Sequence, residues 1–291
     1  MQCVVCNSKT KNVFRIDSYR IVQCLDCTHR MIDADGSPLD IKKIYGDKYF
    51  SGGIGGYSNY LGEKDILIKH GRRYAKILAE YFDKAGTLLD IGSAAGFILK
   101  GLTDCGWRGE GIEVNDRMAD YARKELGVNV HTGTIESFHT EKKYDLICLI
   151  QVIAHLINPR KTIELSYGML SEGGLLLIET WNYKSCMGRL FGRHWHEYSP
   201  PSVLHWFSKE SIHRLMNQFG FELIASGHPV KRLSWEHARG VFISRLNSHS
   251  LSKVGKNILS VIPGNISIPY PAEDLLWFLF KKKAHQSSIP Q

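Results

Sequence analysis

The chain has 291 residues, of which 43% are hydrophobic and 23% are charged, so it has enough apolar side chains for a sizeable core and is not mainly disordered. The chain has 37 Lys and Arg and 29 Asp and Glu, which gives a formal charge of +8. This charge permits an acidic partner without selecting one. No apolar run approaches the roughly 20 residues of a membrane-spanning helix, and no apolar signal segment follows Met1. We therefore expect a cytoplasmic protein without stable membrane insertion.

Four of the seven cysteines form two Cys-x-x-Cys pairs near the start of the chain. Cys3 and Cys6 form the first pair, and Cys24 and Cys27 form the second. This spacing is typical of a closed tetrahedral zinc site, and a reducing cytoplasm argues against disulfides. Four thiolate ligands leave no open coordination position, so we expect a structural Zn²⁺ that folds residues 1–44 into a ribbon. A metal-free knuckle is the alternative.

The ribbon is expected to contain a hairpin at residues 13–22 and to be followed by an aromatic, glycine-rich stretch. Residues 45–60 interleave tyrosines and a phenylalanine with glycines, four of which (Gly52, Gly53, Gly55 and Gly56) are closely spaced, so no regular element is expected there. The stretch is either a mobile flap over a pocket or a linker that packs on the next domain. Residues 61–82 follow with the apolar period of a helix. We group 45–85 as a lid and leading helix.

Strands and helices alternate over residues 86–228, which predicts an α/β fold with a doubly wound, mainly parallel sheet covered on both faces. A C-terminal extension at 229–291 would contain a helix near 251–261. Its segment 274–283 is rich in aromatic and branched residues, which favours a closing strand over an amphipathic helix at a membrane surface. The strands expected before it are 87–91, 109–114, 129–131, 144–150, 174–179 and 221–225, and the helices are 97–105, 116–126, 159–170 and 208–219.

The strand at 87–91 ends in a glycine loop that carries the clearest chemical signal. Gly92 and Gly96 would let the backbone approach a ligand, and the following helix N-terminus offers unpaired N–H groups to an anionic group. A glycine loop alone suits any dinucleotide binder. Here Asp90 precedes the loop and Glu113 ends the next strand, where a carboxylate can accept two hydrogen bonds from a ribose diol.

These residues resemble the first motif of class I S-adenosylmethionine-dependent methyltransferases, an acidic residue followed by Gly-x-Gly-x-Gly. The resemblance continues in order through residues 133–136, 144–147 and 170–174. It implies a Rossmann-like fold with S-adenosylmethionine as the cofactor. The cofactor-binding residues that it implies are Asp90, Gly92, Ala94 (in place of the middle glycine), Gly96, Glu113, Thr134, Ile135 and Gln151.

The resemblance extends to one branch of that family, which carries an N-terminal zinc ribbon and methylates sugars, polysaccharide precursors and secondary metabolites. The cysteine pairs, residues 49–53 and the stretch 195–208 match this branch, whereas Ala154 and Val203 depart from it on the acceptor side. The implied activity is methyl transfer to a small-molecule, sugar or glycan-precursor acceptor, with O-methylation favoured. Residues 194–208 would form an aromatic-rich substrate cap opposite the lid.

A hydroxyl acceptor needs a general base with a pKa near neutrality, and histidine is the usual choice. His155, just beyond the fourth strand, is the first candidate for catalysis, followed by His205 and Tyr57. A purely structural histidine is the equal alternative for His155.

Two other functions stay open from the sequence. One is an RNA methyltransferase whose ribbon grips RNA through the basic residues of 9–20, although basic and aromatic residues form no clear RNA-binding stripe. The other is a non-catalytic protein that keeps the fold. Nucleic acid is therefore not the favoured partner, and the oligomeric state is left open.

Overall fold

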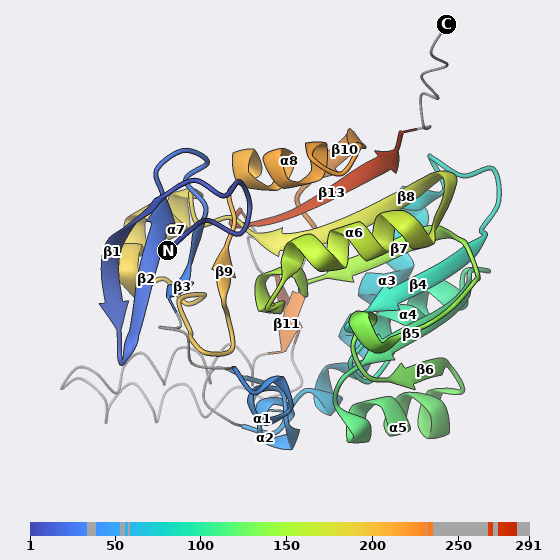
Figure 1. Cartoon of the computed structure of the whole chain (residues 1–291). Helices are drawn as coiled ribbons and strands as arrows, with labels where there is room; N and C mark the ends of the chain where they lie inside the picture. The colour runs from blue at the N-terminus through green and yellow to red at the C-terminus, as the bar shows by residue number, and fades with distance from the viewer. Residues whose placement is uncertain are drawn as a thin grey trace, which may run out of the picture.

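The computed structural model describes residues 1–33, 39–52, 56–57, 59–230, 232–234, 267–269 and 273–283. Its centre is a seven-stranded sheet of order β10-β13-β8-β7-β4-β5-β6 (Figure 1). Neighbouring strands from β6 to β8 pair in parallel, which confirms the predicted α/β fold with a mainly parallel sheet. The strands are β4 (Thr87–Ile91), β5 (Arg108–Glu113), β6 (Asn129–Thr132), β7 (Tyr144–Ile150), β8 (Leu170–Trp181), β10 (Phe221–Gly227) and β13 (Leu275–Lys282).

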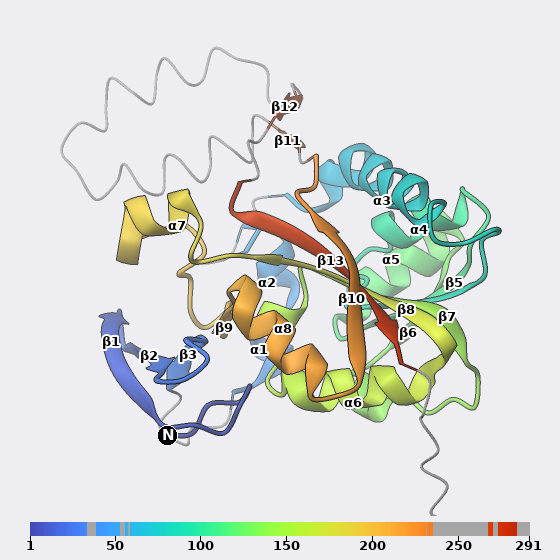
Figure 2. The ribbon, with the colours of Figure 1, turned by 90° about the horizontal axis from the view of Figure 1, so that it is seen from above.

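Helices cover both faces of this sheet (Figure 2). The side chains of β7 show why the strand is apolar throughout, because Leu146 and Cys148 pack on one face and Ile147 and Leu149 on the other. All four are fully buried, as expected for a strand inside a parallel sheet. One face carries α3 (Lys64–Leu78), α4 (Phe97–Thr103) and α5 (Asp116–Leu126), and the other carries α6 (Pro159–Met169) and α8 (Lys209–Asn217).

The closing strand predicted at 274–283 is confirmed. β13 lies between β8 and β10 and pairs antiparallel with both. Its Phe278 and Phe280 are buried, so the segment fills the sheet, and the alternative of a membrane-surface helix is wrong. No helix within the described ranges is long and apolar enough to cross a membrane. The helix expected near 251–261 lies outside the described residues.

The N-terminal segment forms a second sheet that includes a strand from the core. The predicted hairpin is confirmed as β1 (Thr10–Ile16) and β2 (Tyr19–Cys24), followed by β3 (Arg30–Asp33). The fourth strand, β9 (His205–Trp206), follows β8 in the chain and pairs antiparallel with β3 (Figure 1). Main-chain hydrogen bonds therefore join the cysteine ribbon to the segment that follows β8.

The aromatic stretch after the ribbon is more regular than expected. It follows α1 (Ile41–Ile44) and contains α2 (Asp47–Phe50), each about one turn long, so the expectation of no regular element is wrong for residues 47–50. The reason is that the dense glycines at 52–56 follow Phe50 and Gly46 lies at the N-cap of α2, so no glycine within 47–50 opposes a helical turn. Residues 53–55, which carry two of the four closely spaced glycines of 52–56, lie outside the described part. A short 3₁₀ turn, η1 (Leu61–Glu63), leads into α3.

The remaining elements are short. They are α7 (Cys186–Phe191), η2 (Ile135–Ser137), η3 (Ile153–His155), η4 (Gly192–His194), and the pair β11 (Arg232–Ser234) and β12 (Ser267–Pro269).

Candidate functional site

The glycine loop after β4 lies where the order of the sheet reverses. β5 flanks β4 on one side and β7 flanks it on the other, and the helices that follow β4 and β7 lie on opposite faces of the sheet, so this edge is a topological switch point. Gly92 has a φ of +71°, and a Cβ at this position would lie 2.6 Å from Val152 Cγ2. Glycine therefore lets the connections after β4 and β7 pack together at the edge where open α/β sheets bind ligands.

Glu113 at the end of β5 contacts the same loop directly. Its Oε2 accepts a hydrogen bond from the backbone N of Ala94 and its Oε1 accepts one from Asn115 N, both at 2.8 Å. The carboxylate is buried, and desolvation raises its pKa against the effect of these donors. Ala94 has a φ of +47°, in the left-handed region that favours glycine, at the position where the resembled motif has its middle glycine.

Asp90 adds a second buried carboxyl group beside the loop. Desolvation, with a contribution from the charge of Glu113, raises the pKa of Asp90 to about 7. Two buried carboxyl groups that repel one another make this edge of the sheet electronegative, and a cationic ligand group would relieve that repulsion.

Three further residues of the predicted cofactor set lie just beyond the ends of β6 and β7. Thr134 caps η2 just beyond β6, and Ile135 in η2 is buried. Gly133 N donates to Glu113 O at 2.8 Å, which holds the end of β6 against β5. Gln151 follows β7 with a φ of +57°. The structure thus brings the predicted residues of β4, β5, β6 and β7 to one edge of the sheet.

Sequence reasoning missed a buried carboxylate that holds Gln151. Glu179 near the end of β8 is fully buried, and its Oε1 accepts a hydrogen bond from Gln151 Nε2 at 2.8 Å. Its Oε2 accepts from His70 Nε2 at 2.9 Å and from the Tyr74 hydroxyl, both on α3. The available signal was a charged residue in an otherwise apolar strand, since such a residue needs buried partners.

His155 lies in η3, directly beyond β7 and Val152. Its Nδ1 bonds to the carbonyl oxygen of Ser202, and a carbonyl only accepts, so Nδ1 carries the proton. The neutral ring then keeps its acceptor lone pair on Nε2. Desolvation lowers the pKa of His155, which favours this neutral form. The rings of Tyr45 and Tyr49 pack edge-on against it, with centroids at 5.7 and 6.4 Å.

The other two catalytic candidates have different surroundings. His205 is buried, with Nδ1 3.1 Å from His29 Nε2 and Nε2 2.9 Å from Leu156 O, so both ring nitrogens have partners. Tyr57 lies in the aromatic stretch after the ribbon, where its ring contacts Tyr49. Burial, with nearby carboxylates such as Glu197, raises the pKa of Tyr57, so its phenol stays protonated at neutral pH.

The four paired cysteines meet in one cluster. Their Sγ atoms all lie within 4.8 Å of one another, with Cys3 and Cys27 at 3.6 Å and Cys6 and Cys24 at 3.4 Å. Sulfurs around a tetrahedral zinc lie about 3.8 Å apart for a Zn–S bond of about 2.3 Å, so the cluster fits this ion. Backbone N–H groups also donate to the Sγ atoms of Cys3 and Cys24, as thiolates require.

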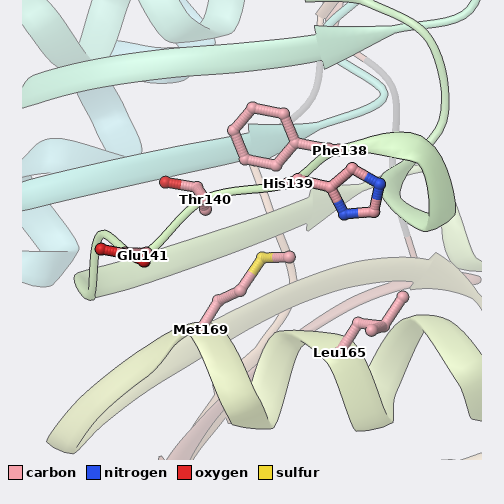
Figure 3. Close-up of a pocket in the computed structure, with 6 residues that line it drawn as sticks. All are labelled: Phe138, His139, Thr140, Glu141, Leu165 and Met169. Carbon is pink, nitrogen blue, oxygen red and sulfur yellow. The ribbon is translucent and has the colours of Figure 1, made fainter.

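The hollow in Figure 3 is separate from these residues. It has a volume of about 470 Å³ and lies between the η2–β7 connection and α6, where Leu165 and Met169 rise toward residues 138–141. None of the predicted site residues lines it, so it does not mark the predicted cofactor site.

Comparison with known proteins agrees with this arrangement. A family model described as a methyltransferase domain matches residues 67–226, more than half of the chain. The chain belongs to the methyltransferase-domain family. Its domain is of the S-adenosylmethionine-dependent type, so this part of the predicted identity is confirmed.

Individual relatives are distant. A ubiquinone biosynthesis O-methyltransferase from Rickettsia felis is 31% identical over 113 residues, a match that covers 37% of this chain and 46% of the relative. The chain therefore spans less than half of that relative's length.

Two solved structures share the fold. A methyltransferase from Thermotoga maritima, described as a possible histamine N-methyltransferase, has a TM-score of 0.50 at 21% identity, covering 77% of this chain and 92% of its own. A magnesium protoporphyrin IX methyltransferase from Synechocystis, solved with bound SAH, has a TM-score of 0.51 at 13% identity, covering 83% and 92%.

Proposed function

We propose that this protein transfers the methyl group of S-adenosylmethionine to a hydroxyl group of a small-molecule, sugar or glycan-precursor acceptor, with His155 as the general base. The observation that carries this proposal is the arrangement of the His155 ring. Ser202 O fixes the proton on Nδ1, so Nε2 keeps a lone pair for an incoming hydroxyl proton.

The residues at the edge of the sheet fit the cofactor. Glu113 would bind the ribose diol, and Asp90 with the 92–96 loop would hold the methionine end, where cationic groups match the buried carboxyl groups. Thr134 and Ile135 would flank the adenine, and Gln151 would line the reactive end. When bound, the cofactor supplies a methyl group already activated as a sulfonium.

The protein would contribute alignment, proton removal and exclusion of water. Tyr45 and Tyr49 pack on His155, and Tyr57 packs on Tyr49, so the lid presents aromatic surface beside the base. Because Tyr57 stays protonated, it can donate a hydrogen bond to the acceptor, and His155 can take the proton of the attacking hydroxyl.

The cysteine cluster would hold one structural Zn²⁺. Cys3, Cys6, Cys24 and Cys27 fill all four positions of a tetrahedral site, so the ion would fold the ribbon and take no part in methyl transfer.

The name of the Rickettsia relative supports a small hydroxylated acceptor over RNA. The test is transfer of label from methyl-labelled S-adenosylmethionine to three groups of probes, namely hydroxylated aromatic compounds, free and nucleotide-linked sugars, and total RNA. We expect label in one of the first two groups, on oxygen by product analysis. Label only in RNA would contradict the proposed acceptor class, and label in none of the groups would support a non-catalytic protein.

A further inference from the structure

Two buried histidines connect the cysteine ribbon to the segment that carries His155. His29 follows the second cysteine pair and is fully buried, and its Nε2 lies 3.1 Å from His205 Nδ1. His205 Nε2 lies 2.9 Å from the carbonyl oxygen of Leu156, the residue after His155. The sequence indicated neither the pairing nor a role for His29.

The direction of these hydrogen bonds follows from the last acceptor. Leu156 O can only accept, so the proton of neutral His205 lies on Nε2 and its Nδ1 is an acceptor. His29 Nε2 must then donate to His205 Nδ1, and His29 Nδ1 is left without a proton. Consistently, His29 Nδ1 has no hydrogen-bond partner. The hydrogen bonds are therefore donated in one direction, from His29 in the ribbon to His205, and from His205 to the carbonyl oxygen of Leu156, the residue after η3.

The carbonyl groups on both sides of His155 are held from this region. Leu204 N donates to Ala154 O at 2.9 Å, and His205 Nε2 donates to Leu156 O. The same short stretch supplies Ser202 O, which accepts the Nδ1 proton of His155. Backbone and ring of the proposed base are thus both fixed by residues 202–205.

The ribbon in turn fixes residues 202–205. His205 pairs with Met31 in the ribbon sheet, and Ile32 N donates to Leu204 O at 3.0 Å. The carbonyl oxygen of His29 accepts a hydrogen bond from Cys24 N at 2.9 Å, so His29 is tied to the cysteine cluster through its backbone.

We propose that His29 and His205 are positioning residues, which transmit the folded state of the cysteine ribbon to His155 and select its Nδ1-protonated tautomer. This inference rests on the proposed role of His155 and extends it. It also gives His205 a different role from the fallback base expected from the sequence, because neither of its ring nitrogens is free to take a proton from an acceptor.

The test needs no acceptor. Full-length, zinc-loaded protein with ¹⁵N-labelled histidine gives a long-range ¹H–¹⁵N spectrum, in which His155 is assigned by its loss in His155→Ala. Wild type should show a single Nδ1–H tautomer for His155. His205→Leu and His29→Phe should shift its two nitrogen resonances toward each other, as expected for a mixture of tautomers. His205→Gln keeps an N–H donor for Leu156 O and should largely restore the wild-type spectrum.

Controls separate positioning from general damage. His139→Gln, an exposed residue beside the Figure 3 hollow, should leave the His155 signals unchanged. Zinc content and S-adenosylmethionine binding, measured by calorimetry, should stay near wild type in each positioning variant. If His205→Leu does not fold, His29→Phe with the milder His29→Gln carries the test.

A wild-type His155 spectrum in folded His205→Leu and His29→Phe would overturn the inference. The proposed role of His155 as the base would be contradicted by a different result, full turnover in His155→Ala. The two outcomes are therefore distinguishable.

Discussion

Buried titratable groups at the carboxyl edge of the sheet set the chemistry at the scale of single residues. Asp90, Glu113 and Glu179 are buried carboxyl groups, and His155 is a desolvated imidazole. Burial raises the pKa of Asp90 and Glu113, so a cationic group beside them would stabilise their ionised form, and burial lowers the pKa of His155, so its ring is neutral and able to accept a proton. This combination suits a cationic cofactor and a hydroxyl acceptor.

The lowered pKa of His155 predicts how turnover depends on pH. Because desolvation lowers this pKa below 6.5, the base is neutral at pH 7 and becomes protonated only as the pH falls further. Turnover with an acceptor found by the labelling panel should therefore be flat above pH 7 and decline with a midpoint below 6.5. His155→Ala should lower turnover by about 10²-fold or more, the usual share of a general base, with cofactor affinity within about twofold. Turnover that keeps its wild-type value in His155→Ala would exclude His155 as the base.

The ionised form of Asp90 should lower the free energy of unfolding of the cofactor-free protein. Its pKa is raised from 3.8 to about 7, so the stability tied to its protonated form is present at low pH and is lost as the pH rises toward 7. Asp90→Asn should raise the free energy of unfolding by about 2–4 kcal/mol at pH 8 and by less than half of that at pH 5, at roughly 1.4 kcal/mol per pKa unit.

Urea unfolding at the two pH values measures this difference. Asp104→Asn is the matched control with the opposite sign, because Lys100 and Arg72 lower the pKa of Asp104. An Asp90→Asn variant that is less stable than wild type at pH 8 would contradict the assigned burial cost.

At the scale of elements, the sequence predicted what depends on local pattern. The alternation of strands and helices, the glycine loop and the closing strand follow from apolar periods and turn residues, and the structure confirms them. The features that the sequence did not predict depend on tertiary contacts. The short strand β9 exists because β3 pairs with it, and Glu179 stays buried because α3 supplies two donors. Such partners lie far apart in the chain, so no local sequence pattern predicts their contacts.

The packing of the connection after β4 against the connection after β7 predicts a coupling between Gly92 and Val152 in a double-mutant cycle. Gly92→Ala places a Cβ 2.6 Å from Val152 Cγ2 at a positive φ, so we expect a loss of about 1–3 kcal/mol of stability and weaker cofactor binding. Val152→Ala in the same chain removes the contacted methyl groups and should recover part of the loss, with a coupling of about 1 kcal/mol.

Denaturation and calorimetry on the four chains of this cycle measure both effects. Gly168→Ala on α6 is the control, because a Cβ there meets nothing within 4 Å and the helix gains about 0.5–1 kcal/mol from alanine. Additive effects of Gly92→Ala and Val152→Ala would show that the two connections do not share this contact.

At the scale of the whole molecule, the ribbon is built into the core through β9. Metal analysis of the purified protein should give about one zinc per chain, and Cys24→Ser should abolish it. Cys105→Ser is the control, because that exposed cysteine lies outside the cluster. Zinc that persists in Cys24→Ser would disprove the assigned ligand set.

The central claim is that the carboxyl edge of the sheet binds S-adenosylmethionine through Glu113, and calorimetric titration tests it most directly. Wild-type protein should bind about one equivalent. Glu113→Ala should bind at least tenfold more weakly, since a hydrogen bond to a charged group is worth roughly 1.5–3 kcal/mol. Glu125→Ala, an exposed residue on α5, should bind like wild type. Absence of binding in wild type, or equal affinity in folded Glu113→Ala, would contradict the account.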